Sequence, residues 1–245
     1  MGVVDAPQWL ISAWTRSVRA VGSPADEAEV RIVGERLLER WSEPGRHFHN
    51  LRHLIAVLAR VDELAEETHE PDVVRLAVWY HGAKFETAKA AALAHRGGED
   101  EVASAALARH ELTTLGVPAV HVERVKHLVT RMARHNPDPE DLDCAVLCDA
   151  DLAVLAAEPQ RYKTYLEEIR EEYAHLPLRA FLEARQRIVA KLLGRPRIFV
   201  SPLGTAWEEP ARQNLAMEQA RLARELEKLD AAEASASAAG PDPAA

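Results

Sequence analysis

The spacing of proline and glycine along the chain most constrains its fold. Proline is favoured at the first position of a helix, because that position leaves its backbone N–H unpaired in any case. Several prolines in this sequence stand directly before a run whose apolar residues recur at helical spacing; these are Pro24, Pro71, Pro118, Pro159 and Pro177. Glycines follow the ends of other runs, at Gly116 and Gly194. The pattern predicts one helix after another.

We therefore expect an all-α protein, which agrees with the abundance of strong helix formers. The expected helices cover residues 7–20, 24–41, 51–67, 99–115, 118–135, 142–156, 159–174, 177–193 and 207–229, and a further helix starts at Pro71 and contains His81. Ser23 and Asn50 are expected to cap two of them. Residues 87–98 are expected to form a short helix and a loop. The strand-like run 197–200 is too short for a sheet.

The chain is long enough for one large domain, and 47% of its residues are hydrophobic. We expect a single helical domain over residues 1–230. Residues 231–245 are rich in Ala, Ser and Pro and are expected to be a disordered tail. The apolar stripe from Trp9 to Val21 is either part of the core or the face of a homodimer.

Charge and apolar runs limit the classes of partner. A net charge of −9 argues against general nucleic-acid binding, which needs a basic surface. No apolar run reaches the roughly 18 residues of a membrane span. Residues 1–22 are amphipathic and lack a signal-peptide cleavage pattern, so we expect a cytoplasmic protein without a membrane partner. The only cysteines, Cys144 and Cys148, are expected to be reduced and buried.

Histidine and aspartate occur on three of the expected helices in otherwise apolar surroundings. His49 and His53 are four residues apart, His81 follows Leu76–Tyr80, and Asp149 and Asp151 lie within 142–156. Residues four apart share a helical face if the helix contains both, whereas a helix that starts at Asn50 would leave His49 at its mouth. The two aspartates, two residues apart, cannot face the same way. Each histidine alone is more simply explained as a hydrogen-bonded core residue. The three together with Asp151 favour a metal site inside a helical core.

Several motifs resemble those of the HD superfamily of metal-dependent phosphohydrolases, whose pattern is His … His-Asp … Asp. His53, His81 and Ala150-Asp151-Leu152 match this pattern. The chain is most similar to a bacterial branch described as predicted HD phosphohydrolases. The similarity covers about residues 8 to 220 and rests on residues 49–53, 76–81, 149–152, 162–173, 185 and 209–215.

The resemblance implies an HD-like helical bundle that hydrolyses a small phosphorylated molecule or nucleotide. It implies that His53, His81 and Asp151 hold a divalent ion, which would be Mn, Mg, Co, Ni or Fe. His49 and Asp149 would stand beside these ligands or bind a second ion. At the matching positions Arg185 and Arg212, we expect buried ion pairs with the Glu-rich helices.

The sequence departs from the family at the residue after His81. The family pattern runs roughly His-Asp-Ala-Val-Tyr-Asp, whereas this chain reads His81 to Glu86 as His-Gly-Ala-Lys-Phe-Glu. Gly82 thus replaces the Asp that joins the metals; it either opens room beside His81 or reflects drift in a disused site. One ion could still be held by three ligands. An alternative is that the site binds no ion.

Three further residues are candidates for catalysis. Lys84 is either a solvated lysine at a helix end or a cation that stands in for the metal. Glu86 is either an exposed charge or a carboxylate supplied from one turn further on, since it shares a face with Gly82. His135 either faces the pocket or favours the C-terminal end of its helix. The segment Gly98-Glu99-Asp100-Glu101 stands near an Asn-Glu-rich stretch of the family.

Two other functions stay open beside the enzyme. One is a catalytically inactive binding or scaffold protein that keeps the shape of the site. The other is a different chemistry on the same fold, such as that of a metal oxygenase, which only the breadth of the superfamily suggests.

Overall fold

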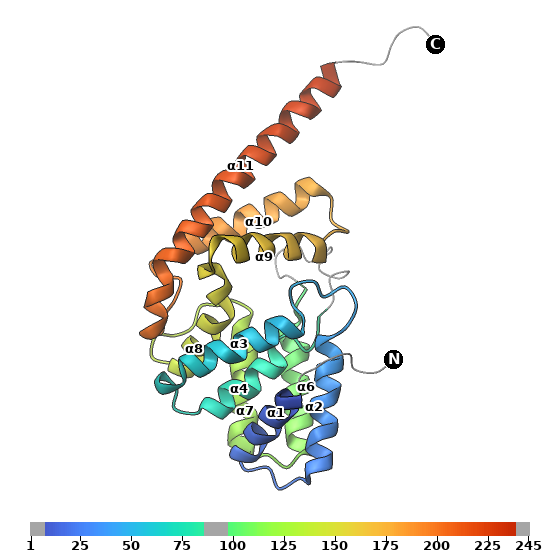
Figure 1. The fold of residues 1–245 in the computed structure, drawn as a ribbon, viewed down its shortest axis with the longest axis vertical. Helices are drawn as coiled ribbons and strands as arrows, with labels where there is room; N and C mark the ends of the chain where they lie inside the picture. The colour runs from blue at the N-terminus through green and yellow to red at the C-terminus, as the bar shows by residue number, and fades with distance from the viewer. Residues whose placement is uncertain (1–7, 86–97, 239–245) are drawn as a thin grey trace, which may run out of the picture.

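A computed structural model describes residues 8–85 and 98–238 of the chain, and in these residues the fold is all-α, as expected. Apart from an isolated bridge between Phe85 and Glu99, the described part of the chain contains no β-structure. Figure 1 labels the α-helices, which are α1 (Gln8–Ala20), α2 (Glu27–Trp41), α3 (Leu51–Glu63), α4 (Pro71–His81), α6 (Glu101–Thr114), α7 (Ala119–Met132), α8 (Leu142–Leu152), α9 (Pro159–Glu172), α10 (Leu178–Leu193) and α11 (Glu208–Ala238). Short 3-10 turns cover Ala65–Glu67, Ala153–Ala156 and Leu203–Trp207.

Side-chain caps fix where two of the helices begin. Asn50 caps α3 as expected, because its side-chain oxygen accepts the N–H of Arg52 at 2.8 Å. The cap of α2 is Asp26, and the expectation of Ser23 at this position was wrong. The Ser23 hydroxyl instead donates to the carbonyl of Leu115 at 2.5 Å, which ties the start of α2 to the end of α6.

The ends of four helices differ from the expected boundaries. Helix α3 stops at Glu63 and gives way to the 3-10 turn 65–67. Helix α7 stops at Met132, before His135, and α8 stops at Leu152 before a second 3-10 turn. Helix α11 continues through 231–238, a stretch assigned to the tail from its composition; residues 239–245 and the Ala-rich part of 87–98 up to residue 97 lie outside the described residues.

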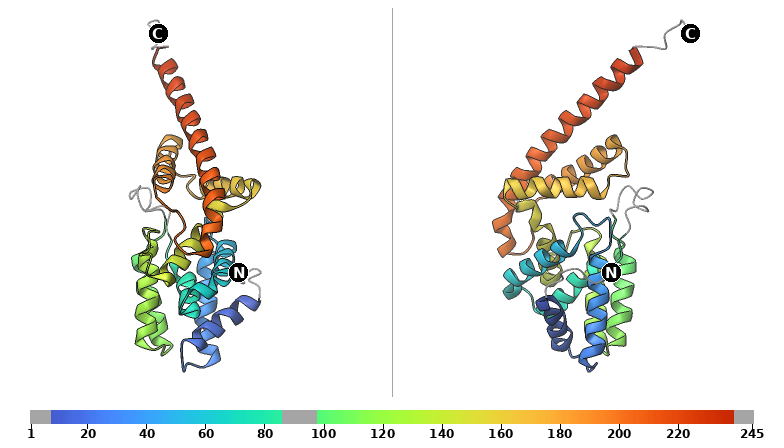
Figure 2. Two further views of the ribbon diagram at one scale, coloured as in Figure 1. Left: turned by 90° about the vertical axis from the view of Figure 1, so that its left-hand side faces the viewer. Right: turned by 45° about the vertical axis from the view of Figure 1, so that its right-hand side comes forward.

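Buried apolar residues form two clusters. The larger is built from α1 to α4 and α6 to α8. The smaller is built mainly from α9, α10 and α11 together with Phe48 and Leu155. Figures 1 and 2 show the same division, with α9 and α10 on one side of α3 and α8, and with the end of α11 projecting beyond the other helices. The side chain of Trp207 packs against both clusters.

The apolar stripe on α1 belongs mainly to the core. Leu10, Trp14 and Val18 are fully buried, and Trp14 Nε1 donates to the carbonyl of Val30 at 2.8 Å. Only Trp9 is half exposed. The stripe therefore stabilises this chain by burial of apolar surface, and no dimer is needed to explain it.

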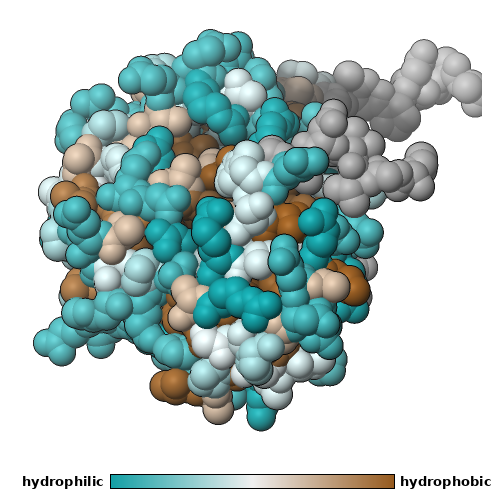
Figure 3. All heavy atoms as spheres, turned by 60° about the horizontal axis from the view of Figure 1, so that its bottom comes forward, coloured by the Kyte–Doolittle hydropathy of each residue, from teal (hydrophilic) through white to brown (hydrophobic). Residues whose placement is uncertain are grey.

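The remaining expectations concern buried charges, thiols and membrane contact. Arg185 forms a buried ion pair with Glu218 of α11 at 2.7 Å, as expected, and the pair that Arg212 forms with Glu208 is partly exposed. Both cysteines are free and buried. Among the described helices, none is long and apolar enough to cross a membrane. The face drawn in Figure 3 is largely hydrophilic, with scattered apolar residues.

Candidate metal centre

Three side chains, each from a different helix, meet at one point in the fold. His53 lies in the first turn of α3, His81 is the last residue of α4, and Asp151 lies near the end of α8. His53 Nε2 is 3.0 Å from Asp151 Oδ1 and 3.3 Å from His81 Nε2, and His81 Nε2 is 3.5 Å from Asp151 Oδ1. Within residues 8–85 and 98–238, this is the one group of His, Cys, Asp or Glu side chains arranged to hold a metal ion.

The spacing of the three donor atoms fits a transition-metal ion. Bonds of about 2.0–2.1 Å in a tetrahedral site place neighbouring donor atoms about 3.3 Å apart. The three separations, 3.0, 3.3 and 3.5 Å, bracket that value. Two imidazoles and one carboxylate also match the three protein ligands of a catalytic zinc-type site, which leaves positions open for other ligands.

A backbone contact prepares His81 for this role. Its Nδ1 is 2.6 Å from the carbonyl of Val78, one turn earlier in α4, and must be the protonated nitrogen to donate there. In the neutral ring, Nε2 is then unprotonated and directs its lone pair towards His53 and Asp151. The ring is 1% exposed and packs against the indole of Trp41, with ring centroids 5.1 Å apart.

The protonation states of the three donors depend on one another and on His135. Burial acts to raise the pKa of Asp151, but hydrogen bonds from His135, His53 and His81 hold that pKa well below its usual range. Burial lowers the pKa of His53, and this effect prevails over the nearby carboxylate. For His81 the burial effect is outweighed by Asp151 and Glu99, so its pKa is raised. The carboxylate is therefore an anion shared among imidazoles.

His135 contacts the three donors through the second carboxylate oxygen of Asp151. Its Nε2 is 2.7 Å from Asp151 Oδ2. Because α7 ends at Met132, His135 lies in the turn after the helix, where it has a φ of 43°. Few residues other than glycine adopt this left-handed conformation, which places the ring over Asp151. Of the two sequence interpretations of His135, the structure therefore has the ring facing the site.

His49 does not join the three donors. It precedes the cap of α3, so it lies at the mouth of the helix and does not share a helical face with His53. Its Nδ1 is 2.5 Å from Glu172 Oε1, and Glu172 Oε2 also accepts the N–H groups of Phe48 and His49 at 3.0 and 2.9 Å. The ring nevertheless lies against His53, with centroids 5.4 Å apart. Burial lowers the pKa of His49, but Glu172 and Glu99 outweigh it and raise the pKa to about 9.

Asp149 faces away from His53, His81 and Asp151. Its carboxylate accepts the N–H of Val200 at 2.9 Å and the N–H of Ser201 at 2.7 Å. It is fully buried, and burial raises its pKa to about 6. The expectation of Asp149 as a neighbour of the ligands or as a ligand of a second ion therefore does not match its orientation. It anchors the segment 197–201, which the sequence marked as strand-like.

The residue after His81 is constrained by its surroundings. A Cβ atom on Gly82 would lie 2.5 Å from Trp41 Cη2, so Gly82 does not open room beside His81, because the indole fills that space. The carbonyl of Gly82 accepts a hydrogen bond of 2.7 Å from the buried guanidinium of Arg46, which also lies over the Trp41 ring.

The segment after Gly82 holds two further candidates, Lys84 and Glu86. Lys84 is partly buried, and its N–H donates to Ser104 Oγ at 3.0 Å. Glu86 lies outside the described residues. Glu99, which pairs with Phe85 in the isolated bridge, was not selected from the sequence. Its charge acts to raise the pKa of His49, His81 and His135.

Glu172 is the second residue that sequence analysis missed. It belongs to a run of charged residues on α9, where nothing distinguishes it from Glu168 or Glu171. Glu99 could have been found, since it lies in the acidic segment 98–101 that stands near a family motif. Only the packing of α9 against residues 48–49 separates Glu172 from its neighbours.

Two surface cavities lie apart from the three donors. One, of about 530 Å³, is lined by residues including His69, Arg124 and Arg131. The other, of about 440 Å³, lies among α9, α10 and α11. Neither is lined by His53, His81 or Asp151.

Comparison with known proteins gives no family assignment. No protein-family model matches the chain, and no curated protein matches it in sequence. The likeness to the HD superfamily therefore stays a resemblance of motifs.

Proposed function

We propose that this protein is a metal-dependent phosphohydrolase of the HD type that acts on a small phosphorylated molecule, such as a nucleotide. The observation that carries the proposal is the convergence of His53, His81 and Asp151, from three helices, at separations of 3.0 to 3.5 Å. Two neutral imidazoles and a carboxylate are a common ligand set for divalent transition metals.

The residues around the donors have separate roles in this proposal. Val78 fixes the tautomer of His81, and His135 orients the carboxylate of Asp151. A divalent ion held by the three donors would supply an activated water and positive charge for a phosphate group. The negative charge of Glu99 acts to raise the pKa of His49, His81 and His135 around the donors.

His49 is the proton donor in this scheme. Glu172 holds its Nδ1 and keeps the ring charged near neutral pH, which leaves Nε2 as the second N–H donor. A charged imidazole beside His53 can bind a phosphate oxygen or protonate a leaving group. Glu172 orients His49 as a buried carboxylate orients the acid–base histidine of a catalytic triad.

A second candidate is an inactive binding protein with the same fold. The donor atoms are close enough to share hydrogen bonds directly, and Trp41 fills the space where the family has a carboxylate. Under this proposal, a proton between the imidazoles and Asp151 holds the cluster together without a metal ion.

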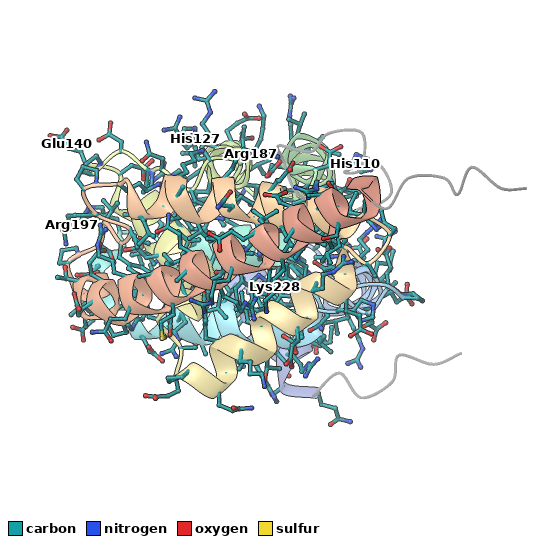
Figure 4. All side chains as sticks on the ribbon, turned by 90° about the horizontal axis from the view of Figure 1, so that it is seen from above. His110, His127, Glu140, Arg187, Arg197 and Lys228 are labelled. Carbon is teal, nitrogen blue, oxygen red and sulfur yellow. The ribbon has the colours of Figure 1, made fainter. Side chains whose placement is uncertain are left out.

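Metal analysis of the purified full chain separates the two candidates. After incubation with Mn²⁺, Co²⁺ or Ni²⁺ and dialysis, mass spectrometry should find one equivalent of ion in the wild type. The His81→Ala and Asp151→Ala variants should lose it. His110→Ala is the matched control, since His110 is exposed and lies at the edge of the molecule in Figure 4. A wild type that retains no ion contradicts the enzyme.

Phosphatase assays then test the reaction. With each ion, nucleotides and sugar phosphates should release inorganic phosphate, and the rate should fall at least about a hundredfold in His49→Ala, the loss typical of a general acid. A loaded protein that hydrolyses none of these would favour the binding function.

A further inference from the structure

Arg195 lies immediately after α10 and reaches across to the turn that carries His135. Its Nη1 donates to the carbonyl of His135 at 2.5 Å, and its Nη2 donates to the carbonyl of Arg134 at 3.0 Å. The guanidinium therefore holds two consecutive carbonyls of the α7–α8 connection. Arginine suits this task because its planar fork presents parallel donors that a lysine cannot reproduce.

His135, whose carbonyl accepts from Arg195, has an unusual backbone conformation. Among the described non-glycine residues, His135 alone has a positive φ, 43°. Such a conformation is strained for a residue with a side chain and persists only where the surroundings determine it. The two bonds from Arg195 supply that constraint from outside α7. The result is the 2.7 Å contact between His135 Nε2 and Asp151 Oδ2.

Arg195 is itself held by α11. Arg212 Nη2 donates to the carbonyl of Arg195 at 2.8 Å, and Arg212 Nη1 donates to the carbonyl of Leu193 at 3.1 Å. The Arg212 guanidinium is paired in turn with Glu208 at 2.7 Å. A continuous series of hydrogen bonds thus runs from the start of α11, through the end of α10, to the carboxylate of Asp151.

We propose that Arg195 is a positioning residue of the metal centre, which holds His135 in its left-handed conformation and thereby aligns the carboxylate of Asp151. The role of the aligned carboxylate as a ligand rests on the function proposed above. Through these hydrogen bonds, α10 and α11 of the smaller cluster are connected to Asp151 on α8.

Metal affinity in a double-mutant cycle tests this role. Arg195→Ala should weaken Co²⁺ binding about tenfold, the effect typical of removing a group that orients a ligand. Arg195→Lys should retain part of the affinity. In a His135→Ala background, Arg195→Ala should cause no further loss, because the residue through which it acts is gone. A purely structural contribution would lower the affinity equally in both backgrounds and would overturn the proposal.

Arg197→Ala is the matched control. Arg197 is exposed, lies two residues further along the chain, at the left-hand edge in Figure 4, and donates to Thr205 Oγ1. Its removal should leave Co²⁺ affinity unchanged. A loss as large as that of Arg195→Ala would show that any arginine of this loop matters, and would overturn the proposal.

Ring ¹H–¹⁵N spectra of the metal-free protein separate this inference from the proposed function. The hydrogen-bonded Nε2 signal of His135 should be present in the wild type and lost in Arg195→Ala. If the wild type binds no ion but this signal is lost, the proposed enzyme fails and the positioning role stands. If the signal is unchanged in Arg195→Ala, the positioning role fails whether or not an ion binds.

Discussion

The indole of Trp41 occupies the volume into which a side chain on residue 82 would project. A Cβ atom added to Gly82 would lie 2.5 Å from Trp41 Cη2, closer than van der Waals contact allows. Trp41 cannot easily move aside, because it is fully buried and its Nε1 donates to the carbonyl of Trp79 at 3.0 Å. The packing of Trp41 therefore favours a glycine at position 82.

Gly82→Ala should destabilise the protein, although the backbone of Gly82, the C-cap of α4, has a negative φ that alanine can adopt. Forcing a methyl group against the Trp41 ring should lower the free energy of unfolding by about 1–3 kcal/mol, as overpacking does. Urea unfolding measures this cost. In a Trp41→Leu background the same substitution should cost less, because the smaller side chain leaves room. A Gly82→Ala variant as stable as the wild type would contradict the packing argument.

A bound divalent ion should stabilise the fold. An ion that binds only the folded chain raises the free energy of unfolding by about 2.7 kcal/mol at a hundred times its Kd. Thermal unfolding with and without Co²⁺ should show a rise in Tm for the wild type. Asp151→Asn should show none, since a neutral amide replaces the only anionic ligand of the three. An equal rise in both proteins would place the ion elsewhere.

The buried pair of Arg185 and Glu218 should be sensitive to removal of one charge. Glu218 accepts from Arg185 at 2.7 Å and from the hydroxyl of Tyr162 at 2.5 Å. Glu218→Gln would leave the guanidinium charge unpaired, which should lower the free energy of unfolding by about 3–5 kcal/mol. The double variant Arg185→Met with Glu218→Leu should recover much of this loss in urea unfolding. Additive losses would contradict the ion-pair account.

Acid should weaken the attachment of α8 to α7. Burial acts to raise the pKa of Asp143, but Thr68 and Arg124 outweigh it and hold the pKa below its usual value. A lowered pKa stabilises the folded state at pH values above the unfolded pKa, about 3.9, and this contribution is lost as the pH falls through the folded value. Stability should therefore drop steeply below about pH 4.

Asp143→Asn tests that pH dependence. It should lower the free energy of unfolding by about 1.5–3 kcal/mol at neutral pH, because Asp143 accepts charge-assisted bonds from Arg124. It should also reduce the slope of stability against pH below about pH 4. Glu123→Gln, which removes an exposed ion pair, serves as the control and should change little. An unaltered acid slope in Asp143→Asn would assign the acid sensitivity to other groups.

The helices themselves could be predicted from local sequence. Prolines and apolar spacing mark where helices begin and which faces are buried, and both depend on residues within one or two turns. The three donors could also be named, since His53, His81 and Asp151 each interrupt a run of apolar residues. Their separations could not, because each comes from a different helix.

Tertiary structure decided the orientation of every other polar residue at the site. Asp149 and Asp151 are two apart on one helix, yet one binds the backbone of Val200 and the other faces the imidazoles. The ring of His49 is paired with Glu172 on α9, and the carbonyl of His135 accepts from Arg195, which follows α10; both partners lie far along the chain. The sequence determines where helices form and which of their faces are apolar, because both depend on residues close together in the chain. Which charged group meets another depends on how the helices pack, and that depends on contacts between residues distant in the sequence.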